Sequence, residues 1–154
     1  MDVLRFLSFP VAVIGSVIFW LWLDGAMRWK GVRVPWLGMA LVALGGWLAG
    51  WCTLLFATRG QGSPHPLVAK TKHLVSSGPY AVVRNPMMWG VGGILSGIAF
   101  WLGSVGLWFG FALFLVFISF FVPGYEERDM ERRFGEEYRE YCRRVPRWWP
   151  RMGR

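Results

Sequence analysis

The sequence predicts an all-α integral membrane protein with about four transmembrane helices and a cytosolic, amphipathic C-terminal helix. Three observations predict this class. Hydrophobic residues make up 55% of the chain and charged residues only 17%, whereas soluble domains carry about 25% charged residues. Long runs contain no charge at all, and the charged residues gather in one internal loop and in the tail. The length of 154 residues fits a single domain, residues 1–154.

The first two spans are predicted at residues 3–23 and 34–57. The first segment is about 31 Å long as a helix, enough for the hydrocarbon core. A cleaved signal peptide is the competing interpretation, but no small-x-small cleavage site follows closely. The second segment contains no charge and is the clearest span. Within it, Gly46 and Gly50 form a small-xxx-small pair that lets another helix approach closely, although glycine is also simply frequent in membrane helices.

The last two spans are predicted at residues 87–102 and 107–122, as a tight hairpin. Residues 87–122 carry no charge, and Gly103-Ser104-Val105-Gly106 offers a turn in their middle. Each half is about 24 Å long as a helix, so the bilayer is expected to thin locally or the helices to pack at a tilt. The alternative of one long helix is disfavoured by the glycines. Pro123-Gly124 ends the hydrophobic block.

The cytosolic parts are predicted to be the loop 58–86 and the tail 124–154. In the tail, an apolar face of one helix is formed by Met130, Phe134, Tyr138 and Tyr141, which step by four, four and three. Glu126 shares this face, whereas Glu127 is expected to turn about 100° away towards the charged side. A carboxylate on a packed face needs a specific partner, such as a positively charged small molecule.

The net charge of +8 favours a membrane surface over nucleic acid as the partner. Nine of the 17 basic residues follow Gly124, but seven acids share that tail. Lysines and arginines that face anionic headgroups mark the cytosolic side, so both termini and the 58–86 loop are predicted to be cytosolic. Cys52 and Cys142 occur in an apolar block and in the charged tail, so no disulfide is expected between them. Two cysteines are also too few for a structural zinc site, and no metal site is predicted.

Several motifs in order resemble the isoprenylcysteine carboxyl methyltransferase family in its bacterial branch, within the wider group of phospholipid methyltransferases. They are Leu74-Val75-x-x-Gly78-Pro79-Tyr80-x-x-x-Arg84-Asn85-Pro86-Met87, Tyr125-Glu126-Glu127, Arg133-Phe134-Gly135-x-x-Tyr138-x-x-Tyr141 and Val145-Pro146-Arg147. The match covers about residues 60–151. No phosphate-binding glycine loop, H-E-x-x-H or G-x-S-x-G motif competes with it.

The resemblance implies an S-adenosylmethionine-dependent methyltransferase of the bacterial inner membrane, with its cofactor on the cytosolic side. The implied cofactor-binding positions are His65, Lys72, His73, Leu74, Val75, Tyr80, Asn85, Pro86, Met87, Met88, Glu126 and Glu127. Arg84 and Glu126 are the candidate catalytic residues. Eukaryotic members have histidine at Asn85, tyrosine at Met88 and arginine at Val122, so the resemblance does not make a prenylcysteine the substrate.

The chemistry expected of these residues is mainly positioning. Glu126 is expected to pair with the amino group of the cofactor. Arg84 either extends to lipid headgroups or orients an anionic group of the acceptor. A lipid-like acceptor would then enter from the bilayer. Two alternatives remain open: a phospholipid amine N-methyltransferase, and a non-catalytic membrane protein whose basic tail docks on lipid or on a partner.

Overall fold

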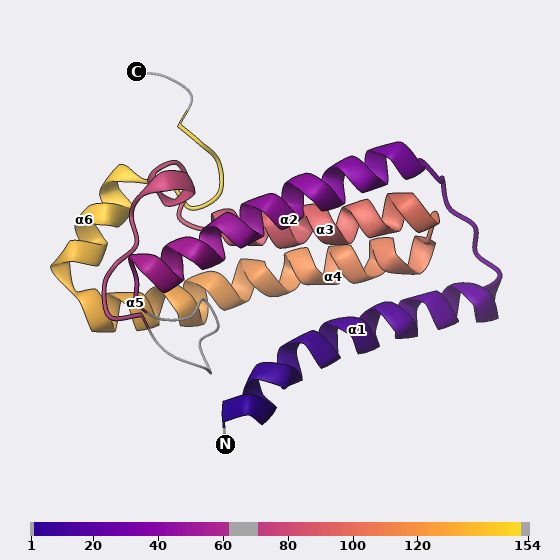
Figure 1. The fold of residues 1–154 in the computed structure, drawn as a ribbon, viewed down its shortest axis with the longest axis horizontal. Coiled ribbons are helices and arrows are strands. Elements are labelled where there is room, and N and C mark those ends of the chain that lie inside the picture. Colours follow the sequence, from indigo (N-terminus) through magenta and orange to yellow (C-terminus); the bar gives the residue numbers. More distant parts are fainter. Residues whose placement is uncertain (1, 62–70, 152–154) are drawn as a thin grey trace. The chain divides into compact units, whose positions relative to one another are not determined.

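The computed structural model describes residues 2–61 and 71–151, with side chains from Gly15 onward, and the described part is helical without strands. The two termini of the described chain and the order of its helices are drawn in Figure 1. Contacts divide the chain into two compact units. The first comprises Met1–Trp47 and Gly90–Val116, and the second comprises Leu48–Trp89 and Phe117–Arg154.

The four predicted apolar segments are all helices. They are α1 (Asp2–Met27), α2 (Pro35–Thr58), α3 (Pro86–Leu102) and α4 (Val105–Phe121). Among the described residues, two helices are long and apolar enough to cross a membrane: α2, and the continuous helix Val105–Phe134 that begins with α4. The apolar helices Gly15–Met27 and Pro86–Leu102 are shorter. The all-α class and the membrane character of the chain are therefore supported.

Glycines bring α2 and α3 into backbone contact in the first unit, where the two helices run side by side (Figure 1). A Cβ atom on Gly38 would lie 2.6 Å from the carbonyl oxygen of Gly97. A Cβ atom on Gly45 would lie 2.5 Å from the carbonyl oxygen of Gly90. Only glycine fits at such separations, because any side chain would force the helices apart.

The expected close-packing pair, Gly46 and Gly50, was therefore the wrong pair. A Cβ atom at either position would meet nothing within 4 Å. The contact uses Gly38 and Gly45 instead. A spacing of seven residues returns to the same face of a helix even more closely than a spacing of four, so both pairs were compatible with the sequence.

The turn between α3 and α4 is shorter than expected. It consists of Gly103 and Ser104, and Val105 and Gly106 already belong to α4. Gly103 has a φ of +66°, which glycine adopts without strain. The carboxylate of Asp24 accepts hydrogen bonds from the Ser104 hydroxyl and, at 2.7 Å, from the Gly106 N–H. This interaction satisfies donors at the start of α4 that have no partner within the helix.

In the second unit, Pro123 and Gly124 do not end the helix, although they end the hydrophobic block. The chain continues through a π-helical turn, η2 (Val122–Glu126), in which the Glu127 N–H donates to the Val122 carbonyl. Proline has no N–H to contribute to a regular helix, and a wider turn accommodates it. The helix α5 (Glu127–Phe134) follows directly.

The tail contains two helices where one was expected. Gly135, with a φ of +54°, separates α5 from α6 (Glu136–Arg144), because this conformation cannot continue an α-helix. The predicted apolar face nevertheless packs as one cluster. It consists of Tyr138, Tyr141 and Val145, with Leu74, Met130, Phe134 and Cys142 packed against them. The tail therefore packs on the loop that precedes α3.

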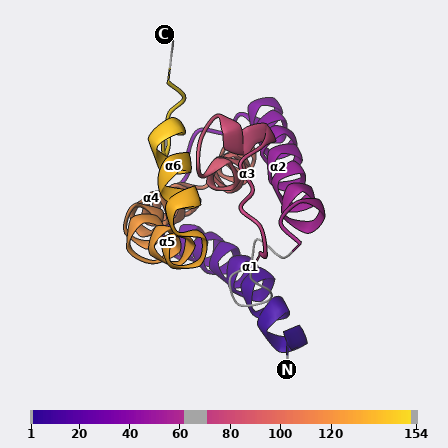
Figure 2. The same ribbon diagram turned by 90° about the vertical axis from the view of Figure 1, so that its left-hand side faces the viewer.

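That loop and the tail are joined by hydrogen bonds. The Tyr141 hydroxyl donates to the Tyr80 carbonyl at 2.7 Å, and the Arg84 N–H donates to the Pro146 carbonyl at 2.9 Å. Figure 2 shows α6 and the turn before α3 from the end at which they meet. The loop before α3 and the tail are thus held together within the second unit, by an apolar cluster and by hydrogen bonds.

Candidate functional site

A short 3-10 helix, η1 (Gly78–Ala81), points Tyr80 into the second unit. Gly78 has a φ of +63°, and Pro79 occupies the first turn, where its missing N–H is harmless. The ring of Tyr80 is buried and meets Phe56 edge to face, with the centroids 5.3 Å apart. Burial raises the pKa of the Tyr80 phenol, so Tyr80 stays protonated at neutral pH. It is therefore a hydrogen-bond donor and not a base.

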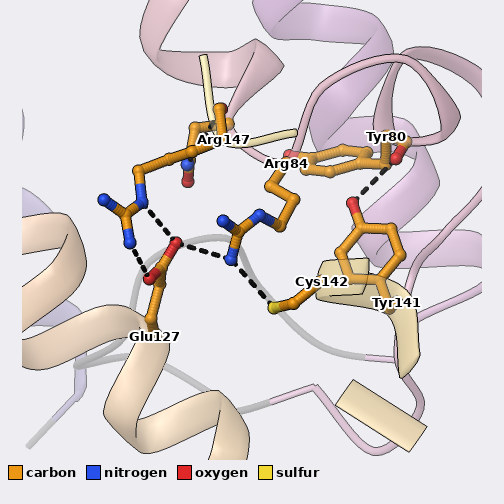
Figure 3. A network of polar contacts seen from close by, with 7 residues as sticks. Tyr80, Arg84, Glu127, Tyr141, Cys142 and Arg147 are labelled. Atoms are coloured by element: carbon orange, nitrogen blue, oxygen red, sulfur yellow. Dashed lines mark hydrogen bonds and ion pairs between the residues drawn. The ribbon is translucent and has the colours of Figure 1, made fainter. Parts of the chain in front are cut away.

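Glu127 lies between two arginines (Figure 3). Its carboxylate accepts two hydrogen bonds from Arg147, at 2.8 and 2.6 Å, and pairs with Arg84 at 2.8 Å. Its side chain is only 15% exposed. The same terminal nitrogen of Arg84 lies 2.8 Å from the Cys142 sulfur. These contacts join the start of α5 to the loop and to the segment after α6.

The expectation that Glu127 faces the charged side is therefore wrong. Glu127 precedes Met130 by three residues and Phe134 by seven, and both spacings return to one helix face. Glu126 and Glu127 both point towards the packed interior. Of the two roles expected for Arg84, extension to lipid headgroups is not favoured, because its side chain is 13% exposed and bound to Glu127.

Glu126 differs from Glu127 in having a buried oxygen without a partner. Its Oε2 atom accepts no hydrogen bond from any described residue. Glu126 lies beyond residue 122, where the apolar segment ends. Burial raises its pKa, and the adjacent charge of Glu127 raises it further. The Nε atom of Arg84 is likewise buried without a partner in the described part of the chain. A buried hydrogen-bonding atom without a partner is costly, so the Glu126 oxygen and the Arg84 Nε–H are suited to bind polar groups of a ligand.

Both of these groups line a cavity of about 30 Å³. Of the predicted site residues, the cavity brings together Leu74, Val75, Tyr80, Arg84, Asn85, Glu126 and Glu127. Lys72 and His73 are exposed and do not line it. Pro86, Met87 and Met88 also lie outside its lining. His65 falls outside the described residues.

Six further residues line the cavity that were not predicted as part of a site: Phe56, Thr71, Met130, Phe134, Tyr138 and Tyr141. Four of them form the apolar face of the tail, which was expected only to pack. The sequence contained a signal that this face lines the site, because the candidate residue Glu126 lies four residues before Met130 and eight before Phe134 on the same face. Arg147 was quoted only as part of a motif, and nothing in its spacing indicated that it binds Glu127.

The described residues contain no group of three or more metal-ligating side chains.

The family model described as phospholipid methyltransferase matches residues 34–137. The chain belongs to the phospholipid methyltransferase family. The matched range contains every residue of the cavity lining except Tyr138 and Tyr141. Membership supports the general expectation of a membrane methyltransferase.

A Haemophilus influenzae protein, named only as uncharacterized, is similar to this family member. The two are 40% identical over 55 residues, which cover 36% of this chain and 87% of the relative. No solved structure matches the chain.

Proposed function

We propose that this protein is an S-adenosylmethionine-dependent methyltransferase of the isoprenylcysteine carboxyl methyltransferase type. It would bind the cofactor at the cavity of the second unit and act on an amphiphilic acceptor. The observation that carries the proposal is the buried, unpartnered carboxylate oxygen of Glu126 in the same cavity as the unpartnered Nε of Arg84. Membership of the phospholipid methyltransferase family supports the reaction class.

The chemistry of the lining fits the amino-acid end of this cofactor. That end carries an ammonium and a carboxylate. The cavity offers the carboxylate of Glu126 for the ammonium and the guanidinium of Arg84 for the carboxylate. Glu126 would accept hydrogen bonds from the ammonium, and Arg84 would donate one to the carboxylate through Nε. The rings of Tyr80 and Phe56, with the side chains of Leu74 and Val75, provide apolar surface for the nucleoside.

The size of the cavity adds a condition to the proposal. A volume of about 30 Å³ is close to that of one water molecule. The cofactor therefore requires the tail helices and the loop to separate. The part of the lining contributed by α5 and α6 is attached to the loop through a few contacts, chiefly those of Glu127 and Tyr141. Ligand binding is expected to widen the space between these elements.

When bound, the cofactor supplies an electrophilic methyl group on a sulfonium. The residues of this chain contribute orientation and exclusion of water, since an in-line displacement needs positioning above all. Glu126 fixes one end of the ligand, while the buried rings of Tyr80 and Tyr141 keep water away from the reacting centre. Glu127 holds Arg84 in place and is not expected to touch the ligand.

The acceptor is proposed to be a lipid with a carboxylate, amine or hydroxyl, entering from the membrane. The proposed topology has four spans, at α1, α2, α3 and α4, in the bacterial inner membrane. Both termini and the loop before α3 would be cytosolic, because that side carries most of the arginines. The family description favours testing a phospholipid amine as one acceptor.

The experiment is calorimetric titration of detergent-purified protein with S-adenosylhomocysteine. We expect binding to wild type, and a loss of about tenfold or more in affinity for Glu126→Gln, because a charged hydrogen bond to the ammonium is removed. The matched control is Glu137→Gln, an exposed glutamate of α6. Absence of binding to folded wild type, or an unchanged affinity of Glu126→Gln, would refute the proposal.

A further inference from the structure

A second, larger hollow lies in the same unit as the cavity but has different walls. It is an apolar groove of about 560 Å³, within the range of about 300–1,000 Å³ that is common for small-molecule sites. Leu48 and Trp51 of α2 form one wall, and Val82 and Val83 of the loop form another. Trp89 of α3 and Trp149 of the C-terminal segment complete it.

The C-terminal wall of this groove is held by specific contacts. The Trp89 indole N–H donates to the Trp148 carbonyl at 3.0 Å. The rings of Trp89 and Trp149 meet edge to face, with centroids 4.9 Å apart. Yet Trp149 is 72% exposed and Val82 is 52% exposed. The groove is thus a formed hollow whose apolar walls lie open to the surroundings.

The charge around the groove is positive. The segments that line it, residues 48–51, 78–89 and 148–150, contain one basic residue, Arg84, and no aspartate or glutamate. Arg84 is paired with Glu127, so the exposed basic residues next to the groove and outside that network are Arg59 and Arg151. Arg59 donates to the Ser77 hydroxyl beside the groove residue Gly78, and the exposed Arg151 follows the groove residue Pro150.

The groove and the cavity lie on opposite faces of one segment. Tyr80, Arg84 and Asn85 line the cavity. Between them in sequence, Val82 and Val83 line the groove. The groove shares no lining residue with the cavity, so a chain lying in the groove is separate from the proposed cofactor position.

We propose that this groove binds an acyl chain of an anionic phospholipid of the surrounding membrane, with the headgroup near Arg59 and Arg151. The occupant is apolar because every lining side chain is apolar. Its headgroup is anionic because basic residues flank the groove without acids. Tryptophans beside basic residues are also typical of the membrane interface, where such a headgroup lies. The bound lipid supports the loop that carries Tyr80, Arg84 and Asn85, and it is not the methyl acceptor.

The experiment uses the intrinsic tryptophans as reporters. Detergent-purified protein is titrated with phosphatidylglycerol brominated on its acyl chains, and with phosphatidylcholine brominated in the same way. Bromine quenches tryptophan fluorescence on contact. We expect saturable quenching by the anionic lipid with a stoichiometry of one, and weaker binding of the zwitterionic lipid. Linear quenching without saturation, or equal affinity for both lipids, would overturn the proposal.

Two variants test the place of binding. Val82→Glu puts a charge into the apolar groove and should weaken lipid binding about tenfold. Val32→Glu is the matched control, a valine that is 74% exposed and outside the groove. If Val82→Glu is poorly folded, Trp149→Ala takes its place and should weaken binding in the same direction. Equal affinity in wild type and in the folded groove variant would show that the lipid binds elsewhere.

A third variant tests the headgroup. Arg151→Gln should reduce the preference for the anionic over the zwitterionic lipid about fivefold, since one basic residue near an anionic surface contributes about 1 kcal/mol. Arg132→Gln, at an exposed arginine of α5, is the control. An unchanged preference in Arg151→Gln would contradict the proposed position of the headgroup. S-Adenosylhomocysteine is absent from these titrations, so their result does not depend on the proposed enzymatic function.

Discussion

Arg147 donates two hydrogen bonds to the carboxylate of Glu127, at 2.8 and 2.6 Å, across 20 residues of chain. Paired hydrogen bonds of this kind fix both position and orientation. Because Glu127 also pairs with Arg84, one carboxylate joins α5, the loop before α3 and the C-terminal segment. The adjacent Glu126 makes no such contact through its buried oxygen. The two glutamates therefore have different roles despite being neighbours.

Glu127→Gln should destabilise the protein. The amide cannot neutralise two arginines, and the part-buried guanidinium of Arg84 would lose its counter-charge. We expect a loss on the order of 2–3 kcal/mol, measured as a lower Tm in detergent. Glu136→Gln, whose carboxylate pairs with Arg139 and Arg143 on the surface, is the control and should change Tm little. A wild-type Tm for Glu127→Gln would show that the network contributes nothing to stability.

The stability change caused by Glu126→Gln should depend on pH. The pKa of Glu126 is raised above its ordinary value of 4.5, so the folded state binds its proton more tightly than the unfolded chain. Wild type therefore loses stability relative to the variant as pH rises from about 4.5 through the raised pKa. Thermal unfolding of both proteins between pH 4 and pH 8 measures this difference. A difference that stays constant with pH would contradict the burial of this carboxylate.

Tyr141→Phe should loosen the contact between α6 and the loop. The variant keeps the buried ring but removes the hydroxyl that donates to the Tyr80 carbonyl at 2.7 Å. We expect a loss of about 1 kcal/mol and faster hydrogen exchange in residues 78–85, measured by mass spectrometry. Tyr125→Phe, at an exposed tyrosine, should leave exchange unchanged. Identical exchange in wild type and Tyr141→Phe would argue that this hydrogen bond does not hold the loop.

Gly45→Ala should destabilise the protein, whereas Gly46→Ala should not. A Cβ atom at Gly45 would lie 2.5 Å from the Gly90 carbonyl oxygen, so the alanine should cost about 1–3 kcal/mol. A Cβ atom at Gly46 would meet nothing, and alanine there should be neutral or stabilise the helix by up to about 1 kcal/mol. Tm values of the two variants in the same detergent measure this contrast. Equal Tm values would exclude close packing of α2 on α3.

The helices could be predicted from the sequence, because a long uncharged segment in a membrane must pair its own backbone N–H and C=O groups, as a helix does. The boundaries at Pro35 and Pro86 follow from proline at the first position of a helix. The continuation of the helix through Pro123 could not be predicted, because it depends on a π-helical turn that local sequence rules do not specify. One helix was expected in the tail, because the periodicity of its apolar face continues across Gly135.

The cavity was predictable on the loop side, where Leu74, Val75, Tyr80 and Asn85 follow a recognisable pattern. The partners of the Arg84 side chain were not, because contacts across 43 residues to Glu127 and across 58 residues to Cys142 leave no periodic signal. The choice of glycines between α2 and α3 was likewise open, since each of two pairs on α2 places both of its glycines on one helix face. Which pair meets a neighbour is decided by tertiary packing alone.

The left-handed backbone at Gly135 divides the wall of the cavity, with Met130 and Phe134 before it and Tyr138 and Tyr141 after it. Rotation at one glycine can move the last two side chains while α5 stays with Glu127. We expect this position to set the rate of ligand exchange and not the equilibrium constant. Gly135→Ala, which puts a side chain at a strained φ of +54°, should then change the rates of ligand association and dissociation more than their ratio. In this protein, different residues would then set the rate of turnover and the affinity for the ligand.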